Sequence, residues 1–490
     1  MKLFPLPERL GNWINGNVSG ASRSQWFPKL NPHDGTVIGT VARSDASDVG
    51  EAVGSAKAVQ PFWAELPGVK RGEILGAVVQ IYRAHEVELA SVVALETGKS
   101  PKDALAEVRG AIALGTFYAG EGQRLYGRTT TSGTPYRQAM TIREPLGVAG
   151  LIVAANTPFA NVAWKVFPAL ICGNSAVVKA AEDTPYTAWA FAALAALGGL
   201  PSGVLNIIHG FGEEAGAPLV QHEDIDLLSF TGSTETGRII GESAAKRLTR
   251  LSLELGGKNP FIVCDDADLE LAVHWATLSA FSNAGQRCAA GSRIIVCDEI
   301  YDEFRGLLLQ RTKDLSVGPT DNDDFGPVIN EAQLDSLIEA IQAVSRRGGR
   351  ILTGGKRLSG ERHRNGFYLA PTLVENVDPN DEFSRAELFG PVAALYRAKN
   401  FQTALSLANN SPYGLTAAIH TRSIHRAQGF IRQIKSGVAV VNAGTYGSEP
   451  HMPFGGVRQS GNGSREPGTE ALDFYANLKD VYIIDDPKQV

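Results

Sequence analysis

Five short apolar runs follow one another between residues 148 and 255, and their regular spacing leaves few folds open to the chain. The runs are VAGLIVAA, SAVVKAA, GVLNIIHG, IDLLSF and LSLEL, and they begin roughly 25 residues apart, with a helix-compatible stretch after each. Such short buried runs are typical of strands, and parallel strands need a crossover helix between them. The spacing therefore predicts repeated β–α–β units in a parallel sheet, an arrangement that suits a nucleotide.

A second group of apolar runs follows between residues 260 and 444. The runs PFIVC, RIIVC, PVAALYRA, TAAIHT and GVAVVNAG are again separated by helical patterns such as AQLDSLIEAIQAV. The simplest interpretation is a second α/β unit over roughly 256–447, joined to the first near Gly256 and Gly257. Ligands favour the space between two such units, so we expect one there.

The composition fits a folded protein that does not bind nucleic acid. With 490 residues, 43% apolar and 20% charged, the chain can bury a core and is expected to form two or three folding units. Its 46 Lys and Arg and 52 Asp and Glu give a net charge of −6 and form no basic block. No apolar run reaches the roughly 18 residues that span a bilayer, and the start MKLFPLPERLGNW lacks the apolar core of a secretory signal. We therefore expect a cytoplasmic protein without a membrane partner.

The cysteines point to one reactive position. Four cysteines are too few for a disulfide framework, and no Cys or His cluster has the spacing of a zinc site, so we expect no metal. Cys288 lies in a Gly-Gln-Arg-Cys loop before the strand-like run RIIVC, which is an accessible place for a thiol. Cys172, Cys264 and Cys297 lie at a helix end or within apolar runs, as core residues do. A buried structural role stays open for Cys288 as well, because free cysteines are among the most buried residues.

A carboxylate with unusual surroundings precedes this thiol. Glu254 lies between Leu253 and Leu255 at the end of a probable buried strand. Poor solvation there would raise the pKa of the carboxyl group, which suits a general base near neutral pH. The alternative is a strand-end glutamate that points into solvent.

Two glycine-bearing turns follow strand candidates. His209-Gly210-Phe211-Gly212 follows VLNII, and Thr231-Gly232-Ser233 follows IDLLSF. Small residues there would let backbone N–H groups and a helix N-terminus approach a pyrophosphate. Glycine also collects in turns for purely steric reasons, so these turns alone do not decide the matter.

Taken together, the motifs resemble those of the aldehyde dehydrogenase superfamily. The run LELGGK at 253–258 and the cysteine that follows Glu254 by 34 residues are similar to the paired active-site signatures of that family. Three further runs resemble family motifs in their usual order: FTGSTE at 230–235, ELFGP at 387–391 and PFGG at 453–456. The resemblance covers nearly the whole chain.

The resemblance implies covalent oxidation of an aldehyde to a carboxylic acid. Cys288 matches the nucleophile, Asn156 an oxyanion donor, and Glu254 the base that activates water to hydrolyse a thioester. Lys165 and the cationic nicotinamide are expected to lower the pKa of the thiol. Because the CoA-acylating branch of the family characteristically lacks the glutamate, we expect a free acid as product.

The resemblance also implies a dinucleotide site. Its expected residues are Lys179, Glu182, Gly212, Gly232, Ser233, Leu255, Glu387 and Phe389. Lys179 and Glu182 match the pair that holds the adenine ribose, Ser233 a pyrophosphate contact, and Glu387 with Phe389 the nicotinamide side. A carboxylate at Glu182 accepts hydrogen bonds from a ribose diol and repels a 2′-phosphate, so we expect NAD, with NADP as a second cofactor because Lys179 is close by.

The chain departs from the common family pattern beside the expected oxyanion donor. Thr157 replaces a bulky aromatic residue, Ala180 replaces a usual proline, and Arg287 precedes the nucleophile. Loss of the aromatic residue is expected to widen one side of the substrate tunnel, and Arg287 either contacts substrate or reaches solvent, with solvent favoured. The expected wall residues are Thr157, Asn161, Trp164, Arg287, Tyr446 and His451. They do not identify the aldehyde.

The implied architecture is two doubly wound parallel-sheet domains plus a small β arm for oligomerisation. The expected Rossmann-like cofactor domain covers 1–127 and 146–255, and the catalytic domain covers 256–447. The arm covers 128–145 and 470–490, and 448–469 returns the chain to the cofactor domain. An exposed arm strand must be covered, so we expect a homodimer or a homotetramer.

Two other functions compete with aldehyde oxidation. A cysteine hydrolase or esterase would use Cys288 without redox chemistry, but it has no need for Ser233, Glu182 and Glu387. A non-catalytic protein on the same fold normally tolerates loss of the cysteine, the glutamate or Asn156, and all three are present.

Overall fold

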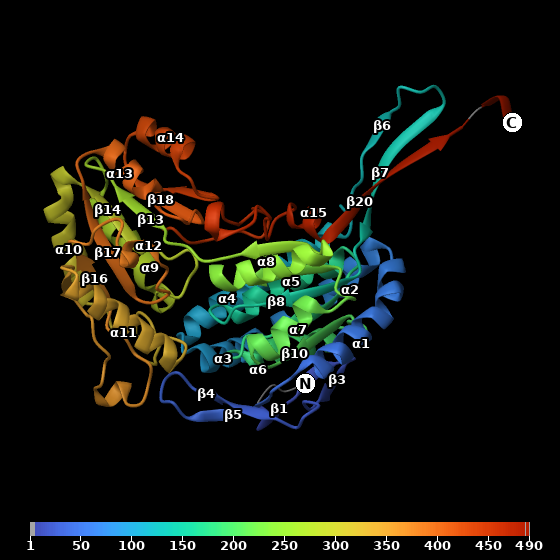
Figure 1. Cartoon of the computed structure of the whole chain (residues 1–490), viewed down its shortest axis with the longest axis horizontal. Coiled ribbons are helices and arrows are strands. Elements are labelled where there is room, and N and C mark those ends of the chain that lie inside the picture. The colour runs from blue at the N-terminus through green and yellow to red at the C-terminus, as the bar shows by residue number, and fades with distance from the viewer. Residues whose placement is uncertain (1–4, 486, 490) are drawn as a thin grey trace.

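The computed structural model describes residues 5–485 and 487–489. Two α/β lobes lie side by side, and an elongated three-stranded arm projects from one of them (Figure 1). Residues 1–4 of the expected cofactor segment, and residues 486 and 490 of the expected arm, lie outside the described part. In the described part no helix is long and apolar enough to cross a bilayer.

The first lobe is built on a seven-stranded sheet with the order β12-β11-β8-β9-β10-β2-β3. The strands from β12 to β10 run parallel, whereas β2 and β3 pair antiparallel at one edge. These strands are β2 (Asn12–Ile14), β3 (Asn17–Ser19), β8 (Val148–Ile152), β9 (Ser175–Lys179), β10 (Leu205–Ile208), β11 (Leu227–Thr231) and β12 (Arg250–Glu254). Every residue of β8, β9 and β10 is buried, as expected for a parallel sheet covered on both faces.

Helices cover the two faces of this sheet with two separate cores. Neighbouring side chains on a strand point to opposite faces, and Leu151 and Val178 belong to one core while Val148 and Val177 belong to the other. The helices of this lobe are α1 (Ala46–Glu65), α2 (Gly68–Ala84), α3 (Glu86–Thr97), α4 (Pro101–Glu121), α5 (Pro158–Ile171), α6 (Pro185–Leu197), α7 (Ala217–Gln221) and α8 (Thr234–Arg247). A small sheet of β1 (Arg9–Leu10), β4 (Trp26–Leu30) and β5 (Val37–Ala42) lies beside them.

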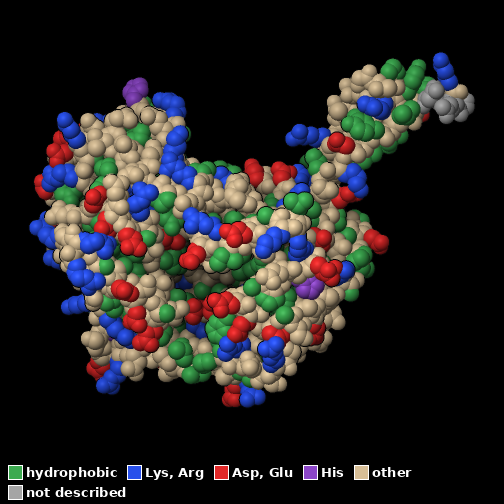
Figure 2. Space-filling model, in the orientation of Figure 1, with side chains coloured by type: hydrophobic (Ala, Val, Ile, Leu, Met, Phe, Trp, Pro, Cys, Tyr) green, Lys and Arg blue, Asp and Glu red, His purple; other side chains and the backbone are tan. Residues whose placement is uncertain are grey.

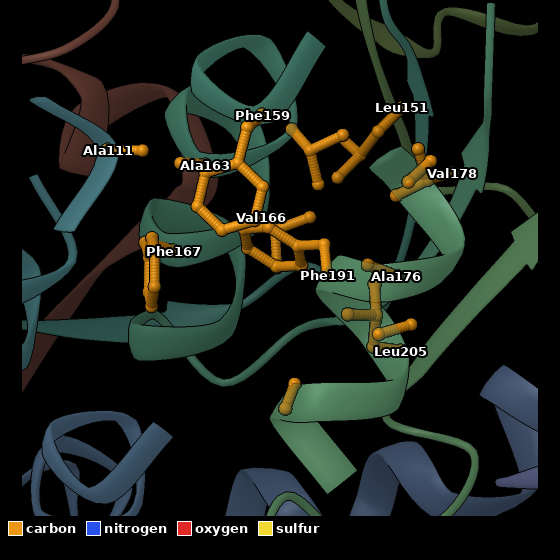
Figure 3. Packing of buried hydrophobic residues seen from close by; sticks show 14 of the residues in the cluster. Ala111, Leu151, Phe159, Ala163, Val166, Phe167, Ala176, Val178, Phe191 and Leu205 are labelled. Atoms are coloured by element: carbon orange, nitrogen blue, oxygen red, sulfur yellow. The ribbon is translucent and has the colours of Figure 1, made fainter. Parts of the chain in front are cut away.

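The larger core fixes α5, the helix that follows β8. Phe159, Val166 and Phe167 of α5 pack against Phe191 of α6 and Val178 of β9 (Figure 3). Pro158 opens the helix at a position where a backbone N–H has no partner within the helix. Residues near the start of α5 are therefore held by a rigid element.

The second lobe has a sheet of the order β15-β16-β17-β14-β13-β18-β19, parallel except for β15. Its strands are β13 (Pro260–Val263), β14 (Arg293–Cys297), β15 (Arg350–Thr353), β16 (Thr372–Glu375), β17 (Val392–Ala398), β18 (Thr416–His420) and β19 (Val438–Val441). Its helices are α9 (Leu269–Phe281), α10 (Tyr301–Lys313), α11 (Glu331–Arg346), α12 (Glu382–Arg385), α13 (Phe401–Asn409) and α14 (Ile424–Gln433). The predicted α/β class with two parallel-sheet lobes is confirmed.

The arm joins two segments that are far apart in the chain. β7 (Arg137–Pro145) pairs along its length with β20 (Ala476–Ile484), and β6 (Thr129–Thr131) flanks β7. The short helix α15 (Ala471–Tyr475) leads into β20. Leu478, Tyr482, Ile483 and Ile484 are about half exposed or more, and hydrophobic side chains are visible along the arm in Figure 2.

Candidate active site

Most of the predicted site residues of the first lobe lie at one edge of its sheet. Asn156 follows β8, Lys179 and Glu182 lie at or after the end of β9, Gly232 follows β11, and Glu254 ends β12. These are the carboxyl ends of parallel strands. The chain proceeds from β8 to β9 and β10, then crosses back to β11 on the other side of β8. Ligands bind at the crevice that such a reversal of strand order creates.

Cys288 comes from the other lobe, on the loop between α9 and β14. Asn283 and Ala284 in this loop have left-handed backbone conformations, with φ of 54° and 53°. Gly285 follows with φ of 66°, and a Cβ there would lie only 2.1 Å from the carbonyl oxygen of Gly390. Left-handed conformations of non-glycine residues cost about 1–2 kcal/mol each, so the surrounding structure must hold this loop.

Two asparagine side chains hold the loop. Asn259 Nδ2 donates to the carbonyl oxygens of Cys288, at 2.7 Å, and Ala290, at 2.9 Å. Asn283 Nδ2 donates to the carbonyl oxygens of Asn156 and Gln286, each at 3.2 Å, and so links the loop to the first lobe. Sequence reasoning missed both residues, although Asn259 directly follows the LELGGK motif.

The Cys288 thiol is half-buried and strongly favours its neutral form. Burial raises its pKa to about 12, and the nearby carboxylates of Glu387 and Glu254 add to this rise. The Ala289 N–H and the Arg287 guanidinium oppose it. The other cysteines, Cys172, Cys264 and Cys297, are fully buried. Some further positive charge must come close before this thiol can ionise near neutral pH.

Glu254 is the most unusual carboxylate of the site. It is 5% exposed, and within the described chain neither of its carboxylate oxygens has a hydrogen-bond partner. Burial raises its pKa well above the usual value, and the negative charge of Glu466 raises it further, against the smaller opposing effect of Lys165. Gly455 has φ of 151°, and a Cβ there would lie 2.8 Å from the Ser464 carbonyl oxygen as well as 2.7 Å from Glu254 Oε1, which favours glycine at this position of the PFGG motif.

Lys165 serves this carboxylate region and not the thiol. Its ammonium group donates to Glu466 Oε2 at 2.9 Å and to Ser229 Oγ at 2.6 Å, and it is almost completely buried. Glu466 also accepts from Ser229 Oγ and from the Tyr475 hydroxyl, both at 2.8 Å. The prediction that Lys165 lowers the pKa of Cys288 is not supported, because its charge is paired with Glu466. Sequence reasoning missed Glu466, which no motif marks.

Asn156 is held from several directions. Its backbone carbonyl accepts from Lys99 Nζ at 2.9 Å, and its Nδ2 donates to the Gln286 carbonyl at 2.9 Å. Glu107 ion-pairs with Lys99 and accepts from the Phe159 N–H at the start of α5. One N–H of the Asn156 amide thus faces the loop that carries Cys288, because Gln286 lies two residues before that cysteine.

The expected ribose pair of the cofactor site is preformed. Lys179 Nζ and Glu182 Oε2 lie 2.8 Å apart. Burial opposes ionisation of Glu182, but the Lys179 charge and hydrogen bond outweigh it, so the pKa of Glu182 is lowered. Ser233 caps the N-terminus of α8, with Gly232 directly before it.

On the nicotinamide side, Gly257 N–H donates to Glu387 Oε1 at 3.0 Å. Burial raises the pKa of Glu387 to about 7, against that hydrogen bond and the Lys258 charge. A Cβ on Gly256 would lie 2.0 Å from Glu387 Oε2, so the glycine permits this contact. Phe389 has a left-handed backbone, and Gln333 donates to its carbonyl at 3.0 Å.

Gly212 and Leu255 differ in what they can offer a ligand. Gly212 is exposed after β10 and has open space around it. The Leu255 side chain is buried in the core shared with α8, and its N–H donates to the Ser460 carbonyl at 3.0 Å. The backbone carbonyl oxygen is therefore the group of Leu255 that can contact a ligand.

The expected pocket wall is only partly assembled. Cys288, Trp164 and Tyr446 pack against a buried cluster that contains Phe454, and the Trp164 and Phe454 ring centroids lie 5.3 Å apart. The His451 side chain is exposed and lies 3.6 Å from the exposed Glu449, and its place in the wall stays a prediction.

The structure adds detail for two other predicted wall residues. Asn161 is buried, and its amide is occupied by Asn156 and Thr157. Arg287 is half-buried, with its guanidinium 4.9 Å above the Tyr446 ring, so the favoured solvent-facing orientation is corrected.

A half-buried thiol from one lobe and a buried carboxylate from the other lie beside a sheet edge of dinucleotide-binding type, as in an enzyme that uses a nucleotide cofactor. The chain matches the aldehyde dehydrogenase family over residues 18–481. It belongs to this family.

Named relatives act on chemically different aldehydes. An alpha-ketoglutaric semialdehyde dehydrogenase of Bacillus subtilis (strain 168) is 38% identical over 475 residues, covering 96% of this chain and 97% of the relative. A mitochondrial benzaldehyde dehydrogenase of Antirrhinum majus is 38% identical over 479 residues, covering 96% and 88%. The crystal structure of betaine aldehyde dehydrogenase from Staphylococcus aureus in complex with NAD+ has a TM-score of 0.96, with 33% identity and coverage of 99% and 96%. Neither a hydrolase without redox chemistry nor a non-catalytic role is favoured by these matches.

Proposed function

We propose that this chain oxidises an aldehyde to a carboxylic acid with NAD+, and that Cys288, Asn156 and Glu254 carry the reaction. The observation that supports this most is the meeting of the three residues: Glu254 acts electrostatically on Cys288, and Asn156 donates to the loop that carries the thiol. They come from three separate segments of the chain.

The residues at the sheet edge suit a dinucleotide. The α8 N-terminus, next to Gly232 and Ser233, offers N–H groups to a pyrophosphate, and the Lys179–Glu182 pair suits a ribose diol. The ionised Glu182 would repel a 2′-phosphate, so we infer that NAD+ is preferred to NADP+. When bound, the nicotinamide ring accepts a hydride and adds a positive charge near the thiol.

Cys288 attacks the carbonyl carbon as a thiolate, so that a C–S bond forms and the carbonyl oxygen becomes an oxyanion. Asn156 Nδ2 donates to this oxyanion, and loss of such a donor typically costs about 3–4 kcal/mol of barrier. After the hydride has left the same carbon, a thioester remains on Cys288. Glu254 then removes a proton from water as the water oxygen attacks the thioester carbonyl, and the Cys288 thiolate leaves.

The direct test is the absorbance of reduced nicotinamide in the presence of NAD+ and a panel of aliphatic, aromatic, hydroxylated and carboxylated aldehydes. We expect turnover with at least one class and release of the free acid. A folded, NAD+-binding protein that oxidises none of them would contradict the proposal.

Arg287 favours an aldehyde that carries a carboxylate. Its Nε is buried without a hydrogen-bond partner, and among the described residues no carboxylate ion-pairs with its guanidinium. An unpaired cation next to the nucleophile suits a substrate anion. The name of the Bacillus relative denotes such an aldehyde, whereas benzaldehyde has no carboxylate.

Arg287→Gln is expected to lower kcat/KM for glutarate semialdehyde about tenfold to a hundredfold, the effect of losing one charged hydrogen bond. Arg287 also lowers the pKa of Cys288, and that effect is common to all aldehydes. The readout is therefore the ratio of kcat/KM for glutarate semialdehyde to kcat/KM for pentanal. Arg287→Lys keeps the charge and serves as the control. An equal loss for both aldehydes would remove Arg287 from substrate recognition.

We infer that the arm pairs with a second copy of this chain in a homodimer or a homotetramer. β20 is the edge strand of its sheet, and Tyr482, Ile483 and Ile484 are exposed on it. An exposed apolar edge needs a cover. Sedimentation velocity is expected to show no monomer at micromolar concentration, and a purely monomeric protein would contradict this inference.

A further inference from the structure

Asn161 lies close to the expected oxyanion donor and takes no part in the steps above. It belongs to the first turn of α5, and 8% of it is exposed. Its Nδ2 lies within hydrogen-bond distance of Thr157 Oγ1 at 2.9 Å, the Thr157 carbonyl at 3.1 Å and Asn156 Oδ1 at 3.3 Å, so its two N–H groups are shared among three acceptors. The polar side chain is therefore held by hydrogen bonds within the protein.

These contacts select one orientation of the Asn156 amide. In the present orientation Oδ1 receives a hydrogen bond from Asn161, and Nδ2 donates to the Gln286 carbonyl. If the amide turned over, Oδ1 would face the carbonyl oxygen of Gln286, and Nδ2 would face the Nδ2 of Asn161. Acceptor would then oppose acceptor and donor would oppose donor, so both contacts would become unfavourable.

The amide has two N–H groups, and Gln286 takes one. The second is left for a substrate oxygen, provided that the amide keeps this orientation. Thr157 takes part by holding the Asn161 amide through both its hydroxyl and its carbonyl. The replacement of an aromatic residue by Thr157 thus supplies a polar support for Asn161, in addition to any change in the width of the tunnel.

We propose that Asn161 is a positioning residue that orients the Asn156 amide toward the oxyanion formed at Cys288. The inference rests on the proposed function, in which Asn156 is the donor. α5 is anchored by Phe159, Val166 and Phe167 in the core, so Asn161 is held on a rigid element. A donor displaced by about 1 Å can cost about a hundredfold in rate, which is the scale of effect that such positioning controls.

The test is a double-mutant cycle on the rate constant of the first burst of reduced nicotinamide, which reports acylation. Asn161→Leu is expected to slow the burst about tenfold to a hundredfold, with the Kd for NAD+ changed less than about twofold. In the Asn156→Ala background, adding Asn161→Leu is expected to change the burst less than about twofold, because Asn161 acts only through Asn156.

A second variant separates hydrogen bonding from packing. Asn161→Asp keeps the shape of the side chain but removes the donor, and it is expected to slow the burst at least as much as Asn161→Leu. An unchanged burst in Asn161→Asp, or the same fold loss from Asn161→Leu in both backgrounds, would overturn the inference. An unchanged burst in Asn156→Ala alone would instead overturn the proposed role of Asn156, so the two failures can be told apart.

Discussion

Cys288→Ala is expected to abolish aldehyde oxidation while NAD+ binding is retained. Without the sulfur no C–S bond forms, and the hydride has no tetrahedral carbon to leave. Removal of the nucleophile in covalent catalysis costs on the order of 10⁶-fold in kcat. The measurement is steady-state production of reduced nicotinamide together with a calorimetric titration of NAD+.

Cys264→Ala is the matched control, because Cys264 follows β13 in the same lobe and is fully buried. We expect this variant to keep the wild-type rate constant per folded molecule. If Cys288→Ala oxidised the aldehyde at more than about one thousandth of the wild-type rate, Cys288 could not be the nucleophile.

Glu254→Gln is expected to give one burst of reduced nicotinamide per active site and then to stall. Attack and hydride transfer do not need the base, whereas hydrolysis of the thioester does, so the variant accumulates the acylated enzyme. General base catalysis contributes about 10²- to 10⁴-fold, and the steady-state rate is expected to fall by that factor. Rapid-mixing absorbance gives the burst, and intact-mass spectrometry detects the acyl group on the protein.

The pH dependence of the wild-type enzyme provides a second readout of the same residue. Glu254 acts as a base only when ionised, and burial followed by the Glu466 charge raises its pKa above 4.5. Deacylation is therefore expected to be lost as the pH falls through this raised pKa and to increase as the pH rises through it. Glu270 is exposed, so Glu270→Gln serves as the control. This control variant should show the same fall in deacylation rate at low pH as the wild-type enzyme. An unchanged steady state in Glu254→Gln would exclude the glutamate from the mechanism.

Much of the fold could be predicted because it depends on local patterns. The runs VAGLI and SAVVK are apolar throughout, and they form the fully buried strands β8 and β9. The turn at Gly232 and Ser233 is expected beside a helix N-terminus, and α8 begins directly after Ser233. Residues at the carboxyl ends of parallel strands share an edge by geometry, which is why Asn156 and Glu254 lie at the same edge of the sheet.

The partners of individual charges could not be predicted in this way. Lys165 pairs with Glu466, which lies 301 residues further along the chain. The pairing exists because the segment after β19 returns to the first lobe and places Glu466 beside Ser229. His451 lies in the same returning segment. Its position near the PFGG motif gave no information on how exposed its side chain is.

The amino-acid sequence by itself determined the order of strands and helices, the two parallel-sheet lobes, and the residue types available for chemistry, because apolar periodicity and turn residues act over a few positions. Only the tertiary structure decided which charges meet, which amide faces Asn156, and which side chains lose contact with water. Those outcomes depend on packing between segments hundreds of residues apart, where the free energy of burial and of hydrogen bonding is set by neighbours that no local pattern specifies.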